Sequence, residues 1–339
     1  MATQTASIER YSRTYRQNEL ALITSCARRG ESLCLVGVAG VGKTNIVRIL
    51  RSNDEFKARY LGADVSRVRF AVLDVNRWEQ TPTHLWQLML EALQIATIDL
   101  SPPPANTVVP ISEENRLGQR LLNHINWVCQ SQQQQIVFVL DDCDLMLARG
   151  PLNMINSLNA FRDAGNPGKL SFLLFTKRLP HVLGRPQELD KSKFYDLIKR
   201  NIYALGLYTF EDARQMVRYL NDQAGNQLRR EDLAHVEHLG GGHSGLIRTI
   251  FETWLRAVPD RQDMVGFFAR QPDIQAECQR ILRGLHEQER EVALRFSRNQ
   301  LNPEDAPLLQ HLMRRTIILE RNPPIWFSPL MSPVLSGGM

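Results

Sequence analysis

The sequence lacks any apolar run close to the roughly 20 residues that a membrane-spanning helix needs. Its first residues, Met1–Ser7, contain no apolar stretch that could form the core of a signal peptide. The five cysteines are odd in number and scattered, and they form no C-x-x-C pair and have no neighbouring histidine cluster. We therefore expect a cytoplasmic protein whose cysteines are reduced and serve packing.

The sequence also lacks a strong excess of charge of either sign. The formal net charge of +5 can be assigned to the first sixty residues, which hold ten Lys or Arg against five Asp or Glu. The rest of the chain is close to neutral. This balance permits contact with nucleic acid without arguing for it, because a solvated basic face is the commoner cause of such an excess.

What the sequence does contain is a glycine-rich loop between a strand and a helix. Residues 37–44 read G-x-x-x-x-G-K-T, four apolar residues precede them, and apolar residues at helical spacing follow. Glycine lets the backbone approach a polyphosphate, while successive N–H groups and the helix N-terminus donate to it. Lys43 would reach the β and γ phosphates, and the Thr44 hydroxyl would bind Mg²⁺. The predicted nucleotide-binding residues here are Gly37, Val38, Ala39, Gly40, Val41, Gly42, Lys43, Thr44 and Asn45.

A second stretch carries acids at the end of an apolar strand. Residues 136–140 are five consecutive apolar residues, and Asp141 and Asp142 follow them, as in a strand buried on both faces. This stretch resembles the Walker B element. Asp141 would hold Mg²⁺, and Asp142 would orient or deprotonate the attacking water. Adjacent acids in a strand point in different directions, so one face cannot present both to a metal ion.

Apolar strands alternate with helices through the first 206 residues. Strands are predicted near residues 33, 68, 136, 170 and 201, which indicates a parallel sheet with helices on both faces. The strand at 170–176 ends in Lys177 and Arg178, and a basic side chain here would sense the γ-phosphate. We assign a catalytic role to Lys43, Asp142 and Arg178.

From Thr209 the pattern becomes helix after helix, and Thr209 with Asp212 is a signature of a helix N-terminus. After about residue 274, helices are followed by apolar segments at 316–320 and 325–327, which suits a winged helix. We predict a P-loop ATPase domain at 1–206, a helical lid domain at 207–260 and a winged-helix-like domain at 261–339. From 261 onward there are ten Arg against nine acids, and a DNA-reading winged helix is usually more basic.

These motifs occur in the order of the AAA+ superfamily of P-loop NTPases, and the chain resembles its STAND-type branch. Thr176-Lys-Arg178 is similar to the Thr-Thr-Arg end of the fourth STAND strand. The segment Leu239–Leu246 resembles the Gly-Gly-His-Pro motif of the helical domain, with Ser244 in place of proline. Tyr15–Glu19 resembles the Gly-Arg-x-x-Glu element, which implies a place for Arg16 beside the adenine.

The chain is also similar to origin-recognition initiators. Leu140–Leu145 resembles their Leu-Asp-Glu-x-Asp-x-Leu stretch, and Gly245–Arg248 fits their Gly-x-x-Arg motif. This similarity implies that Arg248 touches the phosphates, whereas an arginine on an amphipathic helix is otherwise simply solvated. Apart from the resemblance, His243 is interpreted as a helix-terminus residue without a ligand.

Three functional hypotheses follow. The first is an ATP-driven switch with ATP or ADP and Mg²⁺ as cofactors, slow hydrolysis, a separately encoded protein partner and self-association in the ATP state, in bacterial defence or mobile-element biology. The second is an initiator-like or loader-like ATPase whose winged domain binds DNA. The third is a degenerate ATPase that keeps the nucleotide as a structural cofactor. For an arginine finger, Arg185, Arg200 and the pair Arg314 and Arg315 remain open as exposed charges.

Overall fold

The computed structural model describes residues 10–101, 103, 112–183, 188 and 191–336. By its internal contacts the chain divides into two compact units. The sheet unit comprises Asn18–Val36 and Lys43–Tyr203. The helical unit comprises Met1–Gln17, Gly37–Gly42 and Ala204–Met339. The six residues Gly37–Gly42 thus belong to the helical unit by their contacts, although they join two elements of the sheet unit.

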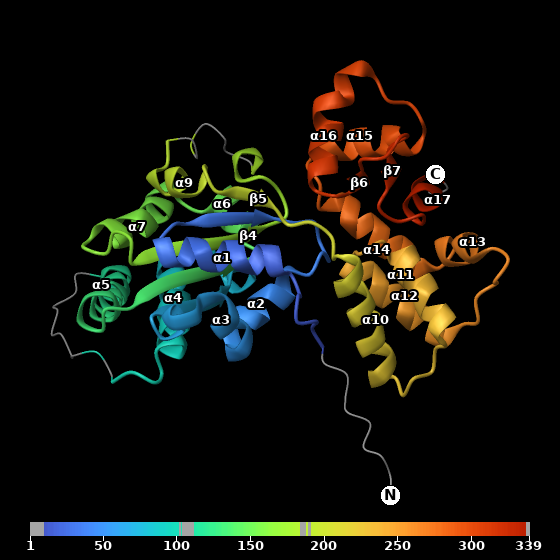
Figure 1. The fold of residues 1–339 in the computed structure, drawn as a ribbon. Helices are drawn as coiled ribbons and strands as arrows, with labels where there is room; N and C mark the ends of the chain where they lie inside the picture. The colour runs from blue at the N-terminus through green and yellow to red at the C-terminus, as the bar shows by residue number, and fades with distance from the viewer. Residues whose placement is uncertain (1–9, 102, 104–111, 184–187, 189–190, 337–339) are drawn as a thin grey trace, which may run out of the picture. The chain divides into compact units, whose positions relative to one another are not determined.

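The sheet unit is built on a five-stranded sheet (Figure 1). The strands, in their order across the sheet, are β2 Val68–Asp74, β3 Gln135–Asp141, β4 Leu170–Thr176, β1 Leu33–Val36 and β5 Ile202–Ala204. Strand β3 pairs in parallel with β2 and β4, and β4 pairs in parallel with β1. The register places Asp74 beside Asp141, so the carboxyl ends of β2 and β3 meet at one edge.

Helices connect the strands of this unit. They are α1 Gln17–Arg29, α2 Lys43–Ser52, α3 Asp54–Leu61, α4 Pro82–Ala96, α5 Glu113–Asn126, α6 Asp144–Arg149, α7 Leu152–Asp163 and α9 Lys193–Ile198. Helix α4 begins at proline after Thr81, whose hydroxyl accepts from the backbone N–H of His84. Proline at a first helical position costs no hydrogen bond, because that N–H would have no partner within the helix.

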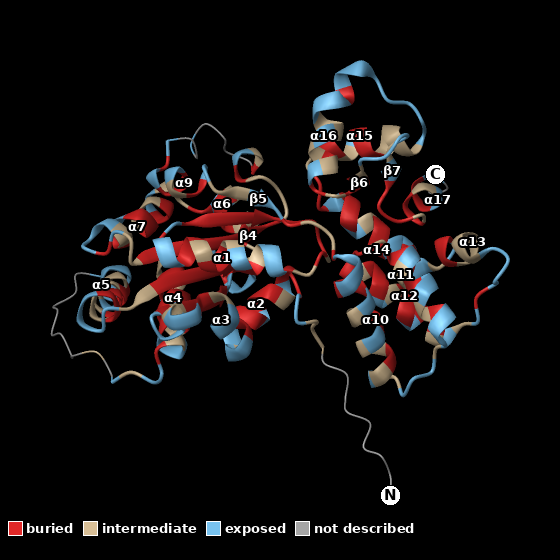
Figure 2. Cartoon of the chain, in the orientation of Figure 1, coloured by how far each residue is buried: buried red, intermediate tan, exposed pale blue. Residues whose placement is uncertain are grey.

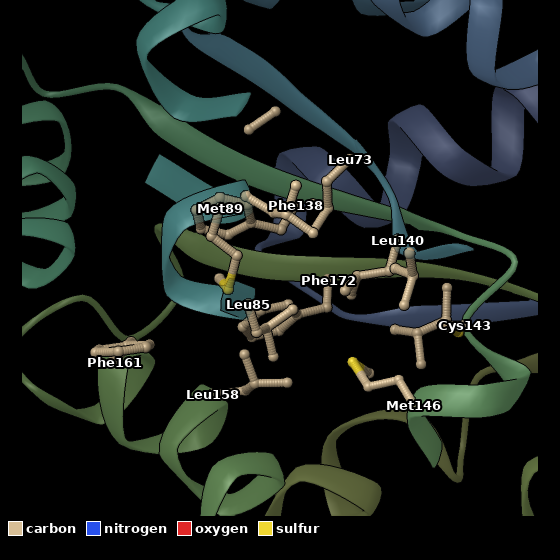
Figure 3. Close-up of a cluster of buried hydrophobic side chains, with 14 of the residues drawn as sticks. Leu73, Leu85, Met89, Phe138, Leu140, Cys143, Met146, Leu158, Phe161 and Phe172 are labelled. Carbon is tan, nitrogen blue, oxygen red and sulfur yellow. The ribbon is translucent and has the colours of Figure 1, made fainter. Parts of the chain in front are cut away.

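The sheet is buried on both faces, as the red strands in Figure 2 show. In β3, Phe138 and the neighbouring Val137 and Val139 point to opposite faces, and each is at most 3% exposed. On one face the ring of Phe138 stacks on that of Phe172 at 6.1 Å, and side chains of α4, α6 and α7 complete the cluster in Figure 3. The interior strands can therefore present polar side chains only at their ends.

The helical unit continues from β5 with helix after helix. Its elements are α10 Phe210–Gln223, α11 Arg230–Gly240, α12 Ser244–Arg256, α13 Met264–Ala269, α14 Pro272–Arg283, α15 Glu287–Ser297, α16 Ala306–Arg314, β6 Ile318–Leu319, β7 Ile325–Trp326 and α17 Met331–Ser336. The hydroxyl of Thr209 accepts from the N–H of Asp212 at 3.1 Å and caps α10 as predicted. Strands β6 and β7 form an antiparallel ribbon.

The predicted fold class is confirmed in the parallel sheet and the helical C-terminal region. All five cysteines are buried free thiols, which agrees with the packing role expected for them. The first helix of the described residues begins at Gln17. The domain boundaries predicted near residues 206 and 260 stay predictions. None of the helices in the described ranges has the length and apolar composition that a bilayer crossing needs.

A buried ion pair holds the C-terminal helices of the helical unit together. Arg315 is 4% exposed and its Nη1 donates to both carboxylate oxygens of Glu289 at 2.8 Å. The ring of His311 lies 3.2 Å from the same carboxylate. Burial alone would raise the pKa of Glu289, but the hydrogen bond from His311 and the charge of Arg315 lower this pKa to about 2.

We expect Glu289→Gln to lower the free energy of unfolding by about 3–5 kcal/mol, because it leaves the buried charge of Arg315 without its counterion. Since folding depresses the pKa of Glu289 from 4.5 to about 2, this stabilisation is complete above about pH 4.5 and is lost as the pH falls toward 2. Urea unfolding of both proteins across this pH range measures the difference.

The control is Glu291→Gln, four residues before Arg295 and 58% exposed. It should change the free energy of unfolding by no more than about 0.5 kcal/mol. Equal losses in the two variants would contradict a special role for the buried pair.

Candidate functional site

The acids at the end of β3 lie in two different backbone conformations. Asp141 is the last residue of the strand. Asp142 follows it with φ of 57°, in the left-handed region that aspartate enters more readily than most residues. Sequence reasoning placed both acids in one strand, pointing to opposite sides. The left-handed turn instead takes Asp142 out of the strand and gives its carboxylate partners of its own.

Those partners of Asp142 are a lysine and an asparagine. Lys177 Nζ lies 2.9 Å from Oδ2 of Asp142, and Asn76 Nδ2 donates to the same oxygen at 3.1 Å. Burial would raise the pKa of Asp142, but these hydrogen bonds outweigh it and hold the pKa below its usual range. The other oxygen, Oδ1, is buried and has no hydrogen-bond partner within the described part of the chain. Asp142 is therefore ionised, with one oxygen available to a further donor.

Lys43, the first residue of α2, is enclosed beside this acid cluster. It is only 7% exposed. Burial lowers its pKa to about 8, although the charges of Asp142 and Asp144 act to raise it. The pKa of Asp141 is raised to about 6 by burial and by neighbouring Asp142. A buried lysine beside carboxylates with shifted pKa values, all at the ends of elements, is typical of a functional site.

Asp144 has a supporting role that sequence reasoning missed. Its carboxylate accepts hydrogen bonds from the backbone N–H groups of Lys177 and Arg178, which follow β4. Burial raises its pKa, and these bonds oppose that rise. Asp144 thus ties the end of β3 to the end of β4. Sequence reasoning also missed Asn76, whose only signal was its position two residues after the end of β2.

The glycine-rich loop Gly37–Gly42 is held by residues of the helical unit. The buried ring of His243 lies with Nε2 at 2.8 Å from the carbonyl oxygen of Ala39. The hydroxyl of Ser244 donates to the carbonyl of Gly40. Arg16 donates from Nη2 to the carbonyl of Val41 at 2.6 Å. The sequence predicted none of these contacts, because they join positions 25 or 204 residues apart along the chain.

Gly40 shows why this loop needs glycine. Its φ is 78°, and a Cβ atom there would collide with the side chains of His243 and Arg280. An L-amino acid with a side chain would strain the backbone and push these residues away. The close approach of the loop to α12 and α14 therefore depends on the missing side chain.

The remaining predicted site residues are placed as follows. Thr44 is exposed and Asn45 half-buried in the first turn of α2. Arg16 is buried and its guanidinium lies 4.7 Å from the ring centre of Tyr208. Arg178 is half-buried after β4, and it is Lys177 that pairs with Asp142. Arg248 is exposed on α12.

Among the arginine-finger candidates, Arg315 was wrongly interpreted as an exposed charge. It is buried against Glu289, because the turn after α16 directs it into the core. Arg200 and Arg314 are exposed. Arg185 lies outside the described residues.

The donors present suit a nucleoside triphosphate with Mg²⁺. Within the described chain, no acceptor is found for the backbone N–H groups of Gly40 and Gly42, and such groups bind phosphate oxygens. No cluster of three or more His, Cys, Asp or Glu in the described ranges could hold a metal ion by itself. A cation at Thr44 and Asp141 would therefore take its other ligands from phosphate oxygens and water.

Comparisons with known proteins place the fold. Residues 27–183 match the family model described as an AAA domain. No curated protein matches the chain. A Walker-type ATPase of Pyrococcus abyssi is similar in structure, with 15% sequence identity, a TM-score of 0.59 and 95% of each chain covered.

Two further solved structures are similar at lower scores. Cdc6p of Pyrobaculum aerophilum has 14% identity and a TM-score of 0.46, with 98% of this chain and 96% of that chain covered. The ORC1 protein of Aeropyrum pernix, solved in complex with DNA, has 14% identity and a TM-score of 0.49, with 95% and 92% covered. Neither the family model nor the Pyrococcus abyssi structure confirms the predicted STAND branch. The family-model match over residues 27–183 and the Pyrococcus abyssi structure confirm the broader prediction that the chain has the AAA+ P-loop NTPase fold.

Proposed function

We propose that this protein binds ATP and ADP through its glycine-rich loop and hydrolyses ATP slowly. The observation that carries the proposal lies in the sheet unit, where buried Lys43 heads α2 beside the acids that follow β3. Lys43 neutralises phosphate charge, and Thr44 and Asp141 hold Mg²⁺. Bound Mg²⁺ would neutralise charge that develops on the phosphate oxygens.

Asp142 is the proposed general base, and its surroundings make it a weak one. The free Oδ1 can accept a hydrogen bond from water, while Lys177 and Asn76 occupy Oδ2. A carboxylate with a lowered pKa accepts a proton poorly, since a general base works best with a pKa near the operating pH. Slow turnover is the expected result. Arg178 and Lys177 remain candidates for sensing the γ-phosphate.

A switch role is supported by a turn in the helical unit that contacts both the glycine-rich loop and Phe327, the residue after β7. Gly241, Gly242 and His243 lie between α11 and α12, and a Cβ atom on Gly241 would collide with the backbone of Phe327. His243, the next residue, has its ring 5.7 Å from that of Phe327 while it also contacts the glycine-rich loop. If the loop moves when nucleotide binds, His243 would transmit that movement to Phe327, which follows the β6–β7 ribbon. A separately encoded partner protein could respond to the resulting change.

A DNA-binding role, as in an initiator or loader, is the second candidate. Helices α14, α15 and α16 followed by the β6–β7 ribbon have the element order of a winged helix. The near balance of ten Arg and nine acids from residue 261 onward implies that phosphate contacts would be few, unless the basic N-terminal region adds to them. Self-association in the ATP state is compatible with either role.

The first prediction from this proposal concerns Lys43→Met. At pH 7 the buried lysine is protonated although burial penalises its charge, so the nucleotide-free variant should be more stable by about 1–3 kcal/mol. The folded pKa of about 8 lies below the usual 10.5, so wild-type stability should rise between these pH values and the variant should lose this rise. Affinity for MgATP should fall about 10- to 100-fold.

Urea unfolding and calorimetric titration measure both effects. Lys193→Met at an exposed position of α9 is the matched control, and it should change neither quantity. A Lys43→Met protein that is less stable and binds MgATP normally would refute the assignment.

The second prediction concerns Asp142→Asn. The amide cannot take a proton, so turnover should fall about 10²- to 10⁴-fold while MgATP still binds. Phosphate release and calorimetric titration separate the two effects. Asp196→Asn, at an exposed position of α9 where the carboxylate pairs with Lys199, is the control and should keep most of the activity. Wild-type turnover no higher than that of Asp142→Asn would support a structural nucleotide instead.

A third experiment separates the two roles. Sedimentation of the protein with ADP or with a non-hydrolysable ATP analogue, each with and without duplex DNA, is expected to differ between nucleotides if the protein is a switch. DNA binding should appear at ~50 mM salt and weaken steeply at higher salt if the protein is initiator-like. Identical behaviour with both nucleotides would eliminate the switch, and no binding at ~50 mM salt would eliminate the DNA role.

A further inference from the structure

Three consecutive carbonyl groups of the glycine-rich loop accept hydrogen bonds from the helical unit. Ala39 accepts from His243 Nε2 at 2.8 Å. Gly40 accepts from the Ser244 hydroxyl at 2.6 Å and from the N–H of Gly245 at 2.9 Å. Val41 accepts from Arg16 Nη2 at 2.6 Å. The donors come from two distant parts of the sequence, the start of α12 and the residue before α1.

The hydrogen bonds of His243 define its tautomer. Its Nδ1 accepts from the backbone N–H of Leu246 at 3.0 Å, which caps the start of α12. An accepting Nδ1 carries no proton, so in the neutral ring the proton is on Nε2 and is donated to Ala39. The side chain is fully buried, and both of its nitrogens are engaged. His243 is therefore held in one orientation by its own helix while it holds the loop.

These carbonyl contacts determine which way the loop amides point. In a planar trans peptide the C=O of one residue and the N–H of the next point in opposite directions. Because the carbonyls of residues 39, 40 and 41 face the donors of the helical unit, the N–H groups of Gly40, Val41 and Gly42 face away from them. The Val41 amide makes a long bond of 3.4 Å to the Val38 carbonyl. Successive amides that converge on one side form a site for an anion.

We propose that His243 and Ser244, together with Arg16, are positioning residues that orient these amides toward the phosphates of a nucleotide. This inference rests on the proposed nucleotide binding. A loop oriented in advance loses less conformational freedom when it binds, so affinity rises without a new contact to the ligand. His243, which the sequence indicated only as a helix-terminus residue, thus acts on the phosphate site through the backbone of the glycine-rich loop.

The experiment compares variants that remove or keep one donor. His243→Leu removes the donor to Ala39, His243→Gln keeps an amide N–H of similar reach, and Ser244→Ala removes one donor to Gly40. Calorimetric titration with MgADP and with a magnesium complex of a non-hydrolysable ATP analogue gives the dissociation constants. We expect about tenfold weaker binding for His243→Leu and for Ser244→Ala, and recovery of most of the affinity in His243→Gln.

Ser328→Ala is the matched control. Ser328 is also a buried serine of the helical unit that donates to a backbone carbonyl, that of Leu239, and it does not touch the loop. Its loss should lower the melting temperature without nucleotide about as much as Ser244→Ala does, and leave nucleotide affinity unchanged. This comparison separates an effect on the loop from a general loss of stability.

The outcomes distinguish the two proposals. Wild-type protein that binds neither nucleotide refutes the proposed function itself. Wild-type binding with unchanged affinity in His243→Leu and Ser244→Ala refutes only the positioning role. Equal weakening in Ser328→Ala, or a His243→Gln protein as weak as His243→Leu, also refutes it. If His243→Leu does not fold, Ser244→Ala and His243→Gln still decide the matter against the same control.

Discussion

A parallel sheet buried on both faces can carry charge only at the ends of its strands, and this constraint concentrates the chemistry of the protein. Along β3 every apolar side chain is buried, and the first carboxylates come at residues 141 and 142. Lys177 follows the neighbouring strand β4 at the same edge. Desolvation at this edge is strong enough to lower the pKa of Lys43 to about 8 and to raise that of Asp141 to about 6.

The pKa values of two adjacent aspartates at this edge shift in opposite net directions, because their surroundings other than burial differ. Asp141 stays in the strand and has a raised pKa, whereas the left-handed turn at Asp142 brings its carboxylate to Lys177 and Asn76, which lower its pKa. Two identical side chains thereby acquire different protonation behaviour, and different roles become available to them. The roles that we propose for them, a metal-binding acid and a weak general base, differ accordingly.

The glycine-rich loop depends on a second constraint, the planarity of the peptide unit. Its carbonyls are bound by Arg16, His243 and Ser244, so its amides are directed without any side chain of its own. The absence of a Cβ atom at Gly40 makes the close approach of α12 feasible. The turn that contains Gly241 and His243 contacts this loop and also lies against Phe327. An ATP switch would require these two contacts to be coupled.

The sequence by itself determined the five strands, the loop at 37–44, the acids after β3 and the helical C-terminal region, because each depends on local periodicity or on a short motif. It also indicated the cap at Thr209, which spans only three residues. The tertiary structure alone decided that Lys177 pairs with Asp142, that Arg315 is buried and that His243 binds Ala39. These contacts join residues that are far apart along the chain, and their geometry depends on packing and on single backbone angles that no periodicity encodes.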